Sequence, residues 1–258
     1  MTGNPNQSRQ PKGLPQHVAG TFKKETGSKT DDDVAPPVTP SDESRRDKAI
    51  RFAHGTAVDR MYHTAGIELP GITFPQTKDI LQGMAPQDVD EDDVRTVLNI
   101  RNAWRLLFGN PDSPVDAELL RDYNRELGRY LYFMPGQWRT QPVGIQGSSY
   151  KPKPRIDYET DVRPVLERTL AEPDPEERAL DLFCAIGRGQ WFNDGNKRTG
   201  LMAANHILIN AGIGVIGLDP ALRREFGDRL VHYYETDDRK PFKAWMREHM
   251  LTRIPEVF

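Results

Sequence analysis

The stretch GQWFNDGNKRTG, residues 189–200, joins two segments that have helical periodicity. After it, residues 197–211 are apolar on most sides, which predicts a central buried helix that begins near residue 196. Before it, apolar residues recur at the i, i+3, i+4, i+7 spacing of a helix face that packs against a core, namely Ala179, Leu182, Phe183 and Ile186. The stretch therefore predicts a tight turn between two interior helices, with Phe192 pointing inward as an anchor.

The polar residues of this turn suit an oligophosphate. Backbone N–H groups around Gly195 would lie at a helix N-terminus, where unpaired donors and the helix dipole favour an anion. Gly195 tolerates a positive φ, and Lys197 and Arg198 add positive charge. Asp194 can hold Mg²⁺ through one carboxylate while a nucleotide supplies further oxygens. The plain alternative is an Asp-Gly-Asn turn in which Asp194 or Asn196 caps the next helix, since no GxxxxGK[ST] spacing is present.

Apolar periodicity outside this stretch predicts a mainly helical, all-α fold. The predicted helices cover residues 45–66, 74–84, 90–109, 115–133, 158–172, 174–190, 196–211, 219–238 and 240–253. Residues 1–42 are rich in Pro, Gly, Ser, Thr and charged residues without an apolar period, which predicts a flexible tail. The folded part is expected to form one domain over residues 43–258.

Composition narrows the classes of partner. The chain has 258 residues, a net charge of −3 and a single cysteine, Cys184, which is expected to be a buried apolar residue. An acidic balance disfavours nucleic acid as a partner. No apolar run approaches the roughly 20 residues needed to span a bilayer, and no signal peptide is evident, so a soluble, cytoplasmic protein without a membrane partner is expected.

Residues 136–154 interrupt the helical pattern. This segment, GQWRTQPVGIQGSSYKPKP, contains three glycines and three prolines, and it predicts a small β-hairpin that turns at Gly147-Ser148-Ser149. A hairpin that projects from a helical body offers an exposed edge which an extended peptide can join. The alternative is a loop without a function. We call residues 136–154 the flap.

The turn resembles the signature of the Fic/Doc (Fido) family, HxFx[DE]GN[GK]R. Six positions match that pattern: Phe192, Asp194, Gly195, Asn196, Lys197 and Arg198. The flap is similar to the hairpin with which that family holds target peptides, and the resemblance covers roughly residues 50–250. It implies a Fic/Fido helical fold with a small β-hairpin flap, within a domain of residues 43–258 that has an N-terminal helical extension.

The resemblance also implies an activity and its ligands. Families of this kind mostly transfer AMP from ATP–Mg²⁺ to a Ser, Thr or Tyr hydroxyl of a protein, whereas Doc-type members transfer the γ-phosphate. Asp194 would bind the metal and take part in catalysis with Lys197 and Arg198. The implied phosphate-binding residues are Asn193, Gly195, Asn196, Lys197 and Arg198, and the implied target-binding residues are Val143, Gly144, Ile145 and Gln146. An antitoxin or a second copy of the chain is a further implied partner.

Gln190 departs from the pattern, because it occupies the position of the motif histidine. A carboxamide cannot accept a proton near pH 7, and a positioned base is typically worth about 10²–10⁴-fold in rate. His206 lies eight residues beyond Arg198, or roughly 12 Å along a helix, so a structural role is expected for it. Three hypotheses follow: a weak adenylylating transferase, a nucleotide-binding or partner-binding pseudoenzyme, and a Doc-like protein kinase toxin. Trp191 is expected near the adenine or the target.

Residues 64–68 resemble the family's inhibitory motif, [ST]xxxE[GN], on an inhibitory helix near residues 56–68. Thr64 and Glu68 fit the spacing, but Leu201 stands where the family has the arginine that pairs with the glutamate. Glu68 is therefore expected either to pair with Lys197 or Arg198 or to be a solvated acid at a helix end.

Overall fold

The computed structural model describes residues 43–255, so the tail predicted over residues 1–42 lies outside the described part. Its helices are α1 (Arg45–Gly55), α2 (Ala57–Ala65), α3 (Phe74–Leu81), α4 (Glu91–Gly109), α5 (Ala117–Gly128), the π-helix η3 (Tyr158–Val162), α6 (Arg163–Leu170), α7 (Pro175–Gly189), α8 (Asn196–Asn210), the 3₁₀ helix η4 (Pro220–Leu222), α9 (Arg223–Thr236) and α10 (Arg239–His249). Two short strands, β1 (Gly214–Ile216) and β2 (Leu251–Arg253), complete the described elements. The all-α prediction is confirmed.

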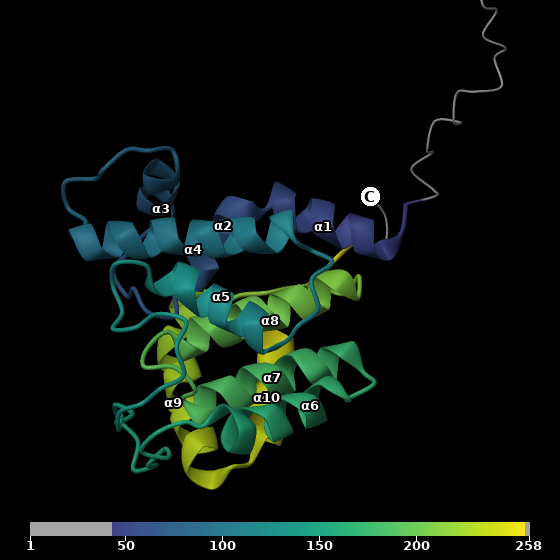
Figure 1. Cartoon of the computed structure of the whole chain (residues 1–258). Helices are drawn as coiled ribbons and strands as arrows, with labels where there is room; N and C mark the ends of the chain where they lie inside the picture. Colours follow the sequence, from purple (N-terminus) through teal and green to yellow (C-terminus); the bar gives the residue numbers. More distant parts are fainter. Residues whose placement is uncertain (1–42, 256–258) are drawn as a thin grey trace, which may run out of the picture. The chain divides into compact units, whose positions relative to one another are not determined.

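Helix α8 is the centre of the fold. All of its residues from Asn196 to Ile209 are buried except Lys197. Figure 1 shows α1–α4 on one side of α8, and α6, α7, α9 and α10 on the other. Met202 and Ile209 pack into the core shared with α1–α5, whereas Leu201, Ala204 and Leu208 pack into the core shared with α7, α9 and α10. The predicted central helix therefore separates two apolar cores.

Helix α7 runs antiparallel to α8 and delivers the turn. Asp174 caps its N-terminus by accepting the N–H of Glu176, Pro175 occupies the first turn, and two acids suit the positive end of the dipole. Its apolar face is fully buried, and Cys184 lies in that face, where burial raises the pKa of the thiol to about 12. The prediction that Cys184 is a buried apolar residue is confirmed.

Two predicted helices are interrupted. The helix expected over residues 45–66 divides at Thr56, which ends α1 and begins α2 and whose hydroxyl donates to the carbonyl of Phe52 at 2.8 Å. The helix expected to reach residue 133 ends at Gly128, because Arg129 leaves the helical conformation with ψ of 119° and Tyr130 follows with a left-handed φ of 64°. In both cases local backbone conformation interrupts an apolar pattern that continues in the sequence.

The C-terminal prediction was wrong beyond residue 249. Leu251–Arg253 form β2, which pairs antiparallel with β1 in the register Gly214↔Arg253, Val215↔Thr252 and Ile216↔Leu251. The backbones approach so closely that a Cβ on Gly214 would lie 2.1 Å from the carbonyl oxygen of Thr252. Pairing with a distant segment therefore overrides helical periodicity at these residues.

The flap also differs from its prediction, because within the described residues its two halves do not pair as strands. Its one bridge joins Trp138 to Phe192 in the turn. A tight turn does form, but over residues 145–148 and so slightly before the predicted Gly147-Ser148-Ser149 turn. In it, Ser148 N–H donates to the Ile145 carbonyl at 3.1 Å and Gly147 has φ of +78°. Three prolines in the segment cannot donate to a ladder, which accounts for the missing hairpin.

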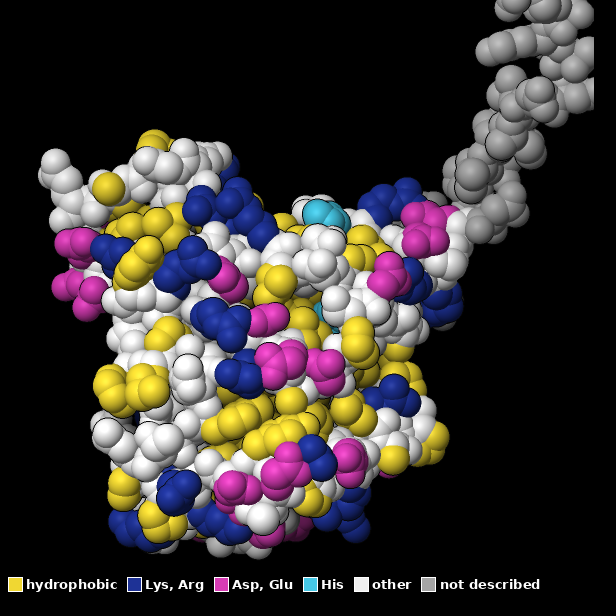
Figure 2. Space-filling model, viewed as in Figure 1, with side chains coloured by type: hydrophobic (Ala, Val, Ile, Leu, Met, Phe, Trp, Pro, Cys, Tyr) yellow, Lys and Arg dark blue, Asp and Glu magenta, His cyan; other side chains and the backbone are white. Residues whose placement is uncertain are grey.

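The surface shows mixed charge. Figure 2 shows basic and acidic side chains interspersed over α4, α5 and α6 on the face that it presents. Among the described helices, none combines the length and the apolar character that crossing a bilayer requires.

Candidate functional site at the join of α7 and α8

The turn between α7 and α8 is held by side chains that bond to its own backbone. Gln190 ends α7 in a left-handed conformation, with φ 48° and ψ 56°. The side chain of Asn196 then closes the turn, since its Oδ1 accepts the N–H of Phe192 and its Nδ2 donates to the carbonyl of Phe192, both at 2.9 Å. Phe192 is fully buried, as predicted. These bonds leave the polar residues between Phe192 and Asn196 on the outside of the turn.

Buried Asn124 on α5 fixes the turn from below. Its Nδ2 donates to the carbonyl of Asp194 at 2.8 Å and to the hydroxyl of Thr199 at 3.1 Å, while its Oδ1 accepts the N–H of Gly136. Asn124 thus ties α5, the turn and the start of the flap together. Sequence reasoning missed it, because a lone Asn inside a helix has no periodic signal.

Gly195 meets a steric demand. It has φ of +74°, and a Cβ at this position would lie 2.6 Å from Cε2 of Tyr132. Only glycine satisfies both conditions without strain. Tyr132, which the sequence analysis also missed, therefore forms the floor of the turn.

A cavity of about 490 Å³ opens over the turn. It contains a large share of the predicted site, and Gly227, Leu230, Val231 and Tyr234 of α9 add a partly apolar wall. The predicted residues that line it are Glu68, Val143, Gly144, Ile145, Gln146, Gln190, Asn193, Asp194, Gly195, Asn196 and Lys197. The fold thus brings the segment after α2, the flap, the turn and α9 to one space.

Arg198 and Thr64 are not among the residues that line this cavity. Arg198 is 5% exposed, lies over the ring of Tyr132 at 5.3 Å, and has a buried Nε without a hydrogen-bond partner. Burial raises the pKa of Tyr132, and Arg198, Asp194 and Glu68 all lie close enough to influence it. Arg198 is therefore a buried guanidinium beside the turn with one unpaired N–H group, which favours an anion near it.

The cavity pairs Glu68 with Lys197. The Glu68 Oε1 lies 3.1 Å from Lys197 Nζ, and both side chains are about one-third exposed or less, at 27% and 33%. This was one of the two partners expected for Glu68. Leu201, at the place of the family's second arginine, is fully buried in the core and cannot reach the cavity as a charge.

Thr64 has a structural place. It is fully buried, donates to the Arg60 carbonyl at 2.8 Å and accepts the indole N–H of Trp104 at 3.2 Å. Helix α2 ends at Ala65, so Glu68 lies in the turn that follows the helix rather than on an inhibitory helix reaching residue 68.

Two carboxylates line the cavity, Glu68 and Asp194. Glu68 is paired with Lys197, so Asp194 is the carboxylate that could hold a metal. Within residues 43–255, no group of three or more His, Cys, Asp or Glu side chains could hold a metal alone. This arrangement fits Mg²⁺, which is usually bound by one or two carboxylates while substrate phosphates and waters complete its shell.

Gln190 occupies the position of the expected base, and its side-chain amide already makes two hydrogen bonds. Gln190 Nε2 donates to the Gly187 carbonyl at 2.6 Å, and its Oε1 accepts from Asn196 at 3.2 Å. His206 does not take the place of the base, because both of its ring nitrogens have other partners. Its Nδ1 lies 2.7 Å from the Tyr123 hydroxyl and its Nε2 lies 2.9 Å from the Ser113 carbonyl. Burial lowers the pKa of His206, as expected for a structural histidine.

Two long-range anchors hold the flap, and neither was predicted. Arg139 is fully buried and donates to four carbonyls, those of Gln190, Gln141, Lys153 and Pro154. At the tip, Glu235 of α9 accepts the N–H of Ser149 at 2.8 Å and the hydroxyls of Ser148 and Ser149. A charged residue in a turn-rich segment was the signal available for Arg139.

Trp191 does not lie where it was expected, near the adenine or the target. It is 2% exposed and lines a different cavity.

These observations define a helical protein with a cavity at the join of α7 and α8 that is bordered by a flap, and comparisons with known proteins give the same fold. Residues 114–208 match the model of the Fic/DOC family, so the chain contains a Fic/DOC family domain. Protein adenylyltransferase fic-1 of Caenorhabditis elegans is 28% identical over 227 residues, covering 79% of this chain and 43% of the relative. The same protein of Caenorhabditis briggsae is 27% identical over 222 residues, with the same coverage.

Solved structures show the same fold. Fic-1 from C. elegans superimposes with a TM-score of 0.65 at 24% identity, covering 78% of this chain and 62% of that one. A Fic family protein from Desulfovibrio desulfuricans gives a TM-score of 0.61 at 19% identity, covering 81% and 63%. The chain thus spans less than half the length of the curated relatives that it matches.

Proposed function

We propose that the protein is a Fic-type transferase that uses ATP–Mg²⁺ to modify a hydroxyl of a protein target, with transfer of AMP as its reaction. The single observation behind this proposal is the cavity over the turn, where Asp194, the N-terminal amides of α8 and Lys197 meet near buried Arg198, whose Nε has no hydrogen-bond partner. The printed activity of the fic-1 relatives, protein adenylyltransferase, is in accord with it.

Each part of the site has a task in this reaction. The amides at Gly195 and Asn196, with Lys197 and Arg198, would hold the phosphates, and Asp194 would hold Mg²⁺, which supplies charge neutralisation when bound. The apolar wall of α9 offers a surface for the base of the nucleotide. The flap residues Val143–Gln146 lie across the cavity, where an extended target segment could align with their backbone.

Gln190 predicts slow turnover. Transfer of a phosphoryl-type group depends strongly on positioning and charge stabilisation, so loss of the base reduces the rate without removing these contributions. The two hydrogen bonds of the Gln190 amide favour a second candidate function, a nucleotide-binding or partner-binding pseudoenzyme. Lys197, in the cradle position where the AMP-transferring branch has glycine, is the residue that favours a Doc-like kinase acting in a toxin system.

Labelled ATP separates these functions. The purified chain is incubated with Mg²⁺, a nucleotide-depleted cell lysate and ATP labelled on the α- or the γ-phosphate. Label from the α-phosphate on protein supports AMP transfer, label from the γ-phosphate alone supports a kinase, and ATP binding without either supports a pseudoenzyme. Absence of ATP binding in calorimetry would contradict the transferase, the kinase and the nucleotide-binding pseudoenzyme.

The Gln190→His variant tests whether only the base is missing. We expect transfer to rise about 10²–10⁴-fold, because an imidazole can accept the target proton. Gln190→Ala is the matched control and should show no gain. A Gln190→His protein that binds ATP but transfers no faster would reject a latent transferase.

A further inference from the structure

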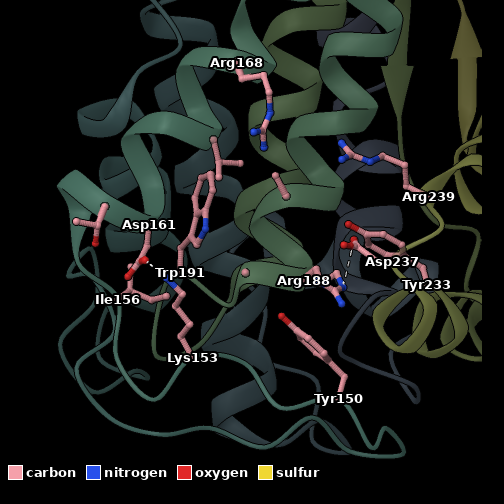
Figure 3. A pocket seen from close by; sticks show the side chains of 14 residues that line it. Tyr150, Lys153, Ile156, Asp161, Arg168, Arg188, Trp191, Tyr233, Asp237 and Arg239 are labelled. Carbon is pink, nitrogen blue, oxygen red and sulfur yellow. Dashed lines mark hydrogen bonds and ion pairs between the residues drawn. The ribbon is translucent and has the colours of Figure 1, made fainter.

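A second cavity, of about 330 Å³, lies behind the flap and shares no lining residue with the first. It is formed by the second half of the flap, α6, the end of α7, and the segment that joins α9 to α10. Trp191, two residues before Asn193 of the turn, forms part of its wall (Figure 3). None of the roles proposed above uses this space.

The lining has an excess of positive charge. Four basic residues face it, Lys153, Arg168, Arg188 and Arg239, against two acidic residues, Asp161 and Asp237. Lys153 is paired with Asp161, and Arg188 lies 3.4 Å from Asp237. Arg239 lies 3.4 Å from Asp181, but Lys243 lies closer to that carboxylate, at 2.6 Å. The guanidinium of Arg168 therefore has no neutralising partner within residues 43–255, whereas Arg239 shares Asp181 with Lys243.

Three hydrogen-bond donors in the lining have no partner among residues 43–255. They are the guanidinium of Arg168, the indole N–H of Trp191 and the hydroxyl of Tyr150. Arg188 stacks on the Tyr150 ring at 4.1 Å and donates to the Tyr234 carbonyl, which fixes its position. Figure 3 shows Arg168 and Arg239 extending toward the same space from α6 and from the start of α10. Donors on several sides of one cavity call for a ligand rich in acceptors.

We propose that this second cavity binds a small phosphate-bearing molecule. Its volume lies at the lower end of the range for small-molecule sites, and guanidinium forks match phosphate oxygens in two-point hydrogen bonds. The open donors of Arg168 and Trp191 would engage the phosphate, with Arg239 adding charge. A bound molecule would contact both Tyr150 of the flap and Trp191 beside Gln190, so it would hold the flap to the turn.

The test follows the indole N–H of Trp191 by NMR during titration with inorganic phosphate at constant ionic strength. The Trp191→Phe variant assigns that signal among the four tryptophans. We expect a saturable shift of the Trp191 signal, and Arg168→Gln should weaken phosphate binding at least about 5-fold by removing a charge-assisted hydrogen bond. Arg105→Gln, at an exposed arginine on α4 outside the cavity, makes the same charge change and should alter nothing.

Three results would overturn the proposal. They are an unmoved Trp191 signal, an equal shift with chloride alone, and unchanged phosphate affinity in Arg168→Gln. The Lys197→Gln variant excludes an indirect effect, because it weakens anion binding at the turn: loss of the Trp191 shift in that variant would place the phosphate in the first cavity instead. Arg168 is exposed and unpaired, so its variant is expected to fold, and dispersed NMR signals verify this.

Discussion

The turn and the flap face the same cavity, and both lack regular secondary structure, but they are held in different ways. The turn lies between two buried helices and is closed by Asn196, only a few residues away along the chain. The flap depends on Arg139 at its base and on Glu235, 86 residues beyond Ser149, at its tip. This contrast teaches that the turn is closed by local hydrogen bonds, with Asn124 of α5 as a distant support, whereas the tip of the flap is held through a distant contact to α9.

The largest expected effect on stability comes from the base of the flap. Arg139→Met leaves four partly buried carbonyls without their donor, so we expect the free energy of unfolding to fall by about 3–5 kcal/mol in urea denaturation. Arg155→Met, at an exposed arginine just beyond the flap, is the control and should change stability by no more than about 0.5 kcal/mol. Equal losses in both variants would remove Arg139 as the anchor.

The second-largest effect on stability is expected at Gly195 in the turn. Gly195→Ala forces a side chain into a left-handed conformation and against Tyr132, so we expect a loss of about 1–3 kcal/mol together with weaker ATP binding. Gly227→Ala, in α9 where a Cβ meets nothing within 4 Å, should instead stabilise the protein by about 0.5–1 kcal/mol. Thermal unfolding of both variants measures the difference, and a neutral Gly195→Ala would mean that the turn is less constrained than its contacts indicate.

The difference between local and distant contacts also decides which features of the fold and the site could be predicted from the sequence. The helices α7 and α8, the inward Phe192 and the position of the turn between the two helices were predictable, because their determinants lie within residues 175–210. The flap anchors, the pairing of β1 with β2, and the floor formed by Tyr132 and Asn124 were not, because each depends on a distant partner. Trp191 was assigned to the wrong cavity, since periodicity does not say which face of a turn a side chain takes.

A smaller effect is expected where the N-terminal region meets the turn. Glu68→Gln releases Lys197 from its ion pair, so ATP affinity in calorimetry should rise by about 3–10-fold, while stability changes by no more than about 1 kcal/mol. Glu118→Gln breaks a comparable pair with Arg121 outside the cavity and should leave ATP affinity unchanged. Weaker ATP binding in Glu68→Gln would show that the glutamate supports the nucleotide site instead of competing with it.

The smallest effect concerns the tip of the flap. Hydrogen bonds from Ser149 and Ser148 lower the pKa of Glu235, so its hold on the flap is complete above the ordinary glutamate pKa of about 4.3 and is lost as pH falls through the lower folded value. The NMR shift of the Ser149 amide should therefore change at acidic pH. In Glu235→Gln this shift should not titrate, and a titration that persists would point to another group.

The central claim is that the turn joining α7 and α8 presents the α8 amides, Asp194 and Lys197 to a magnesium-bound polyphosphate, with Arg198 behind them. The most direct measurement is a crystal structure of the wild-type chain grown with Mg²⁺ and a non-hydrolysable ATP analogue. The account predicts the phosphates against the amides of Gly195 and Asn196, the metal on Asp194, and Lys197 turned from Glu68 to the nucleotide. An empty turn with the Lys197–Glu68 pair intact, in crystals whose protein binds the analogue elsewhere, would contradict it.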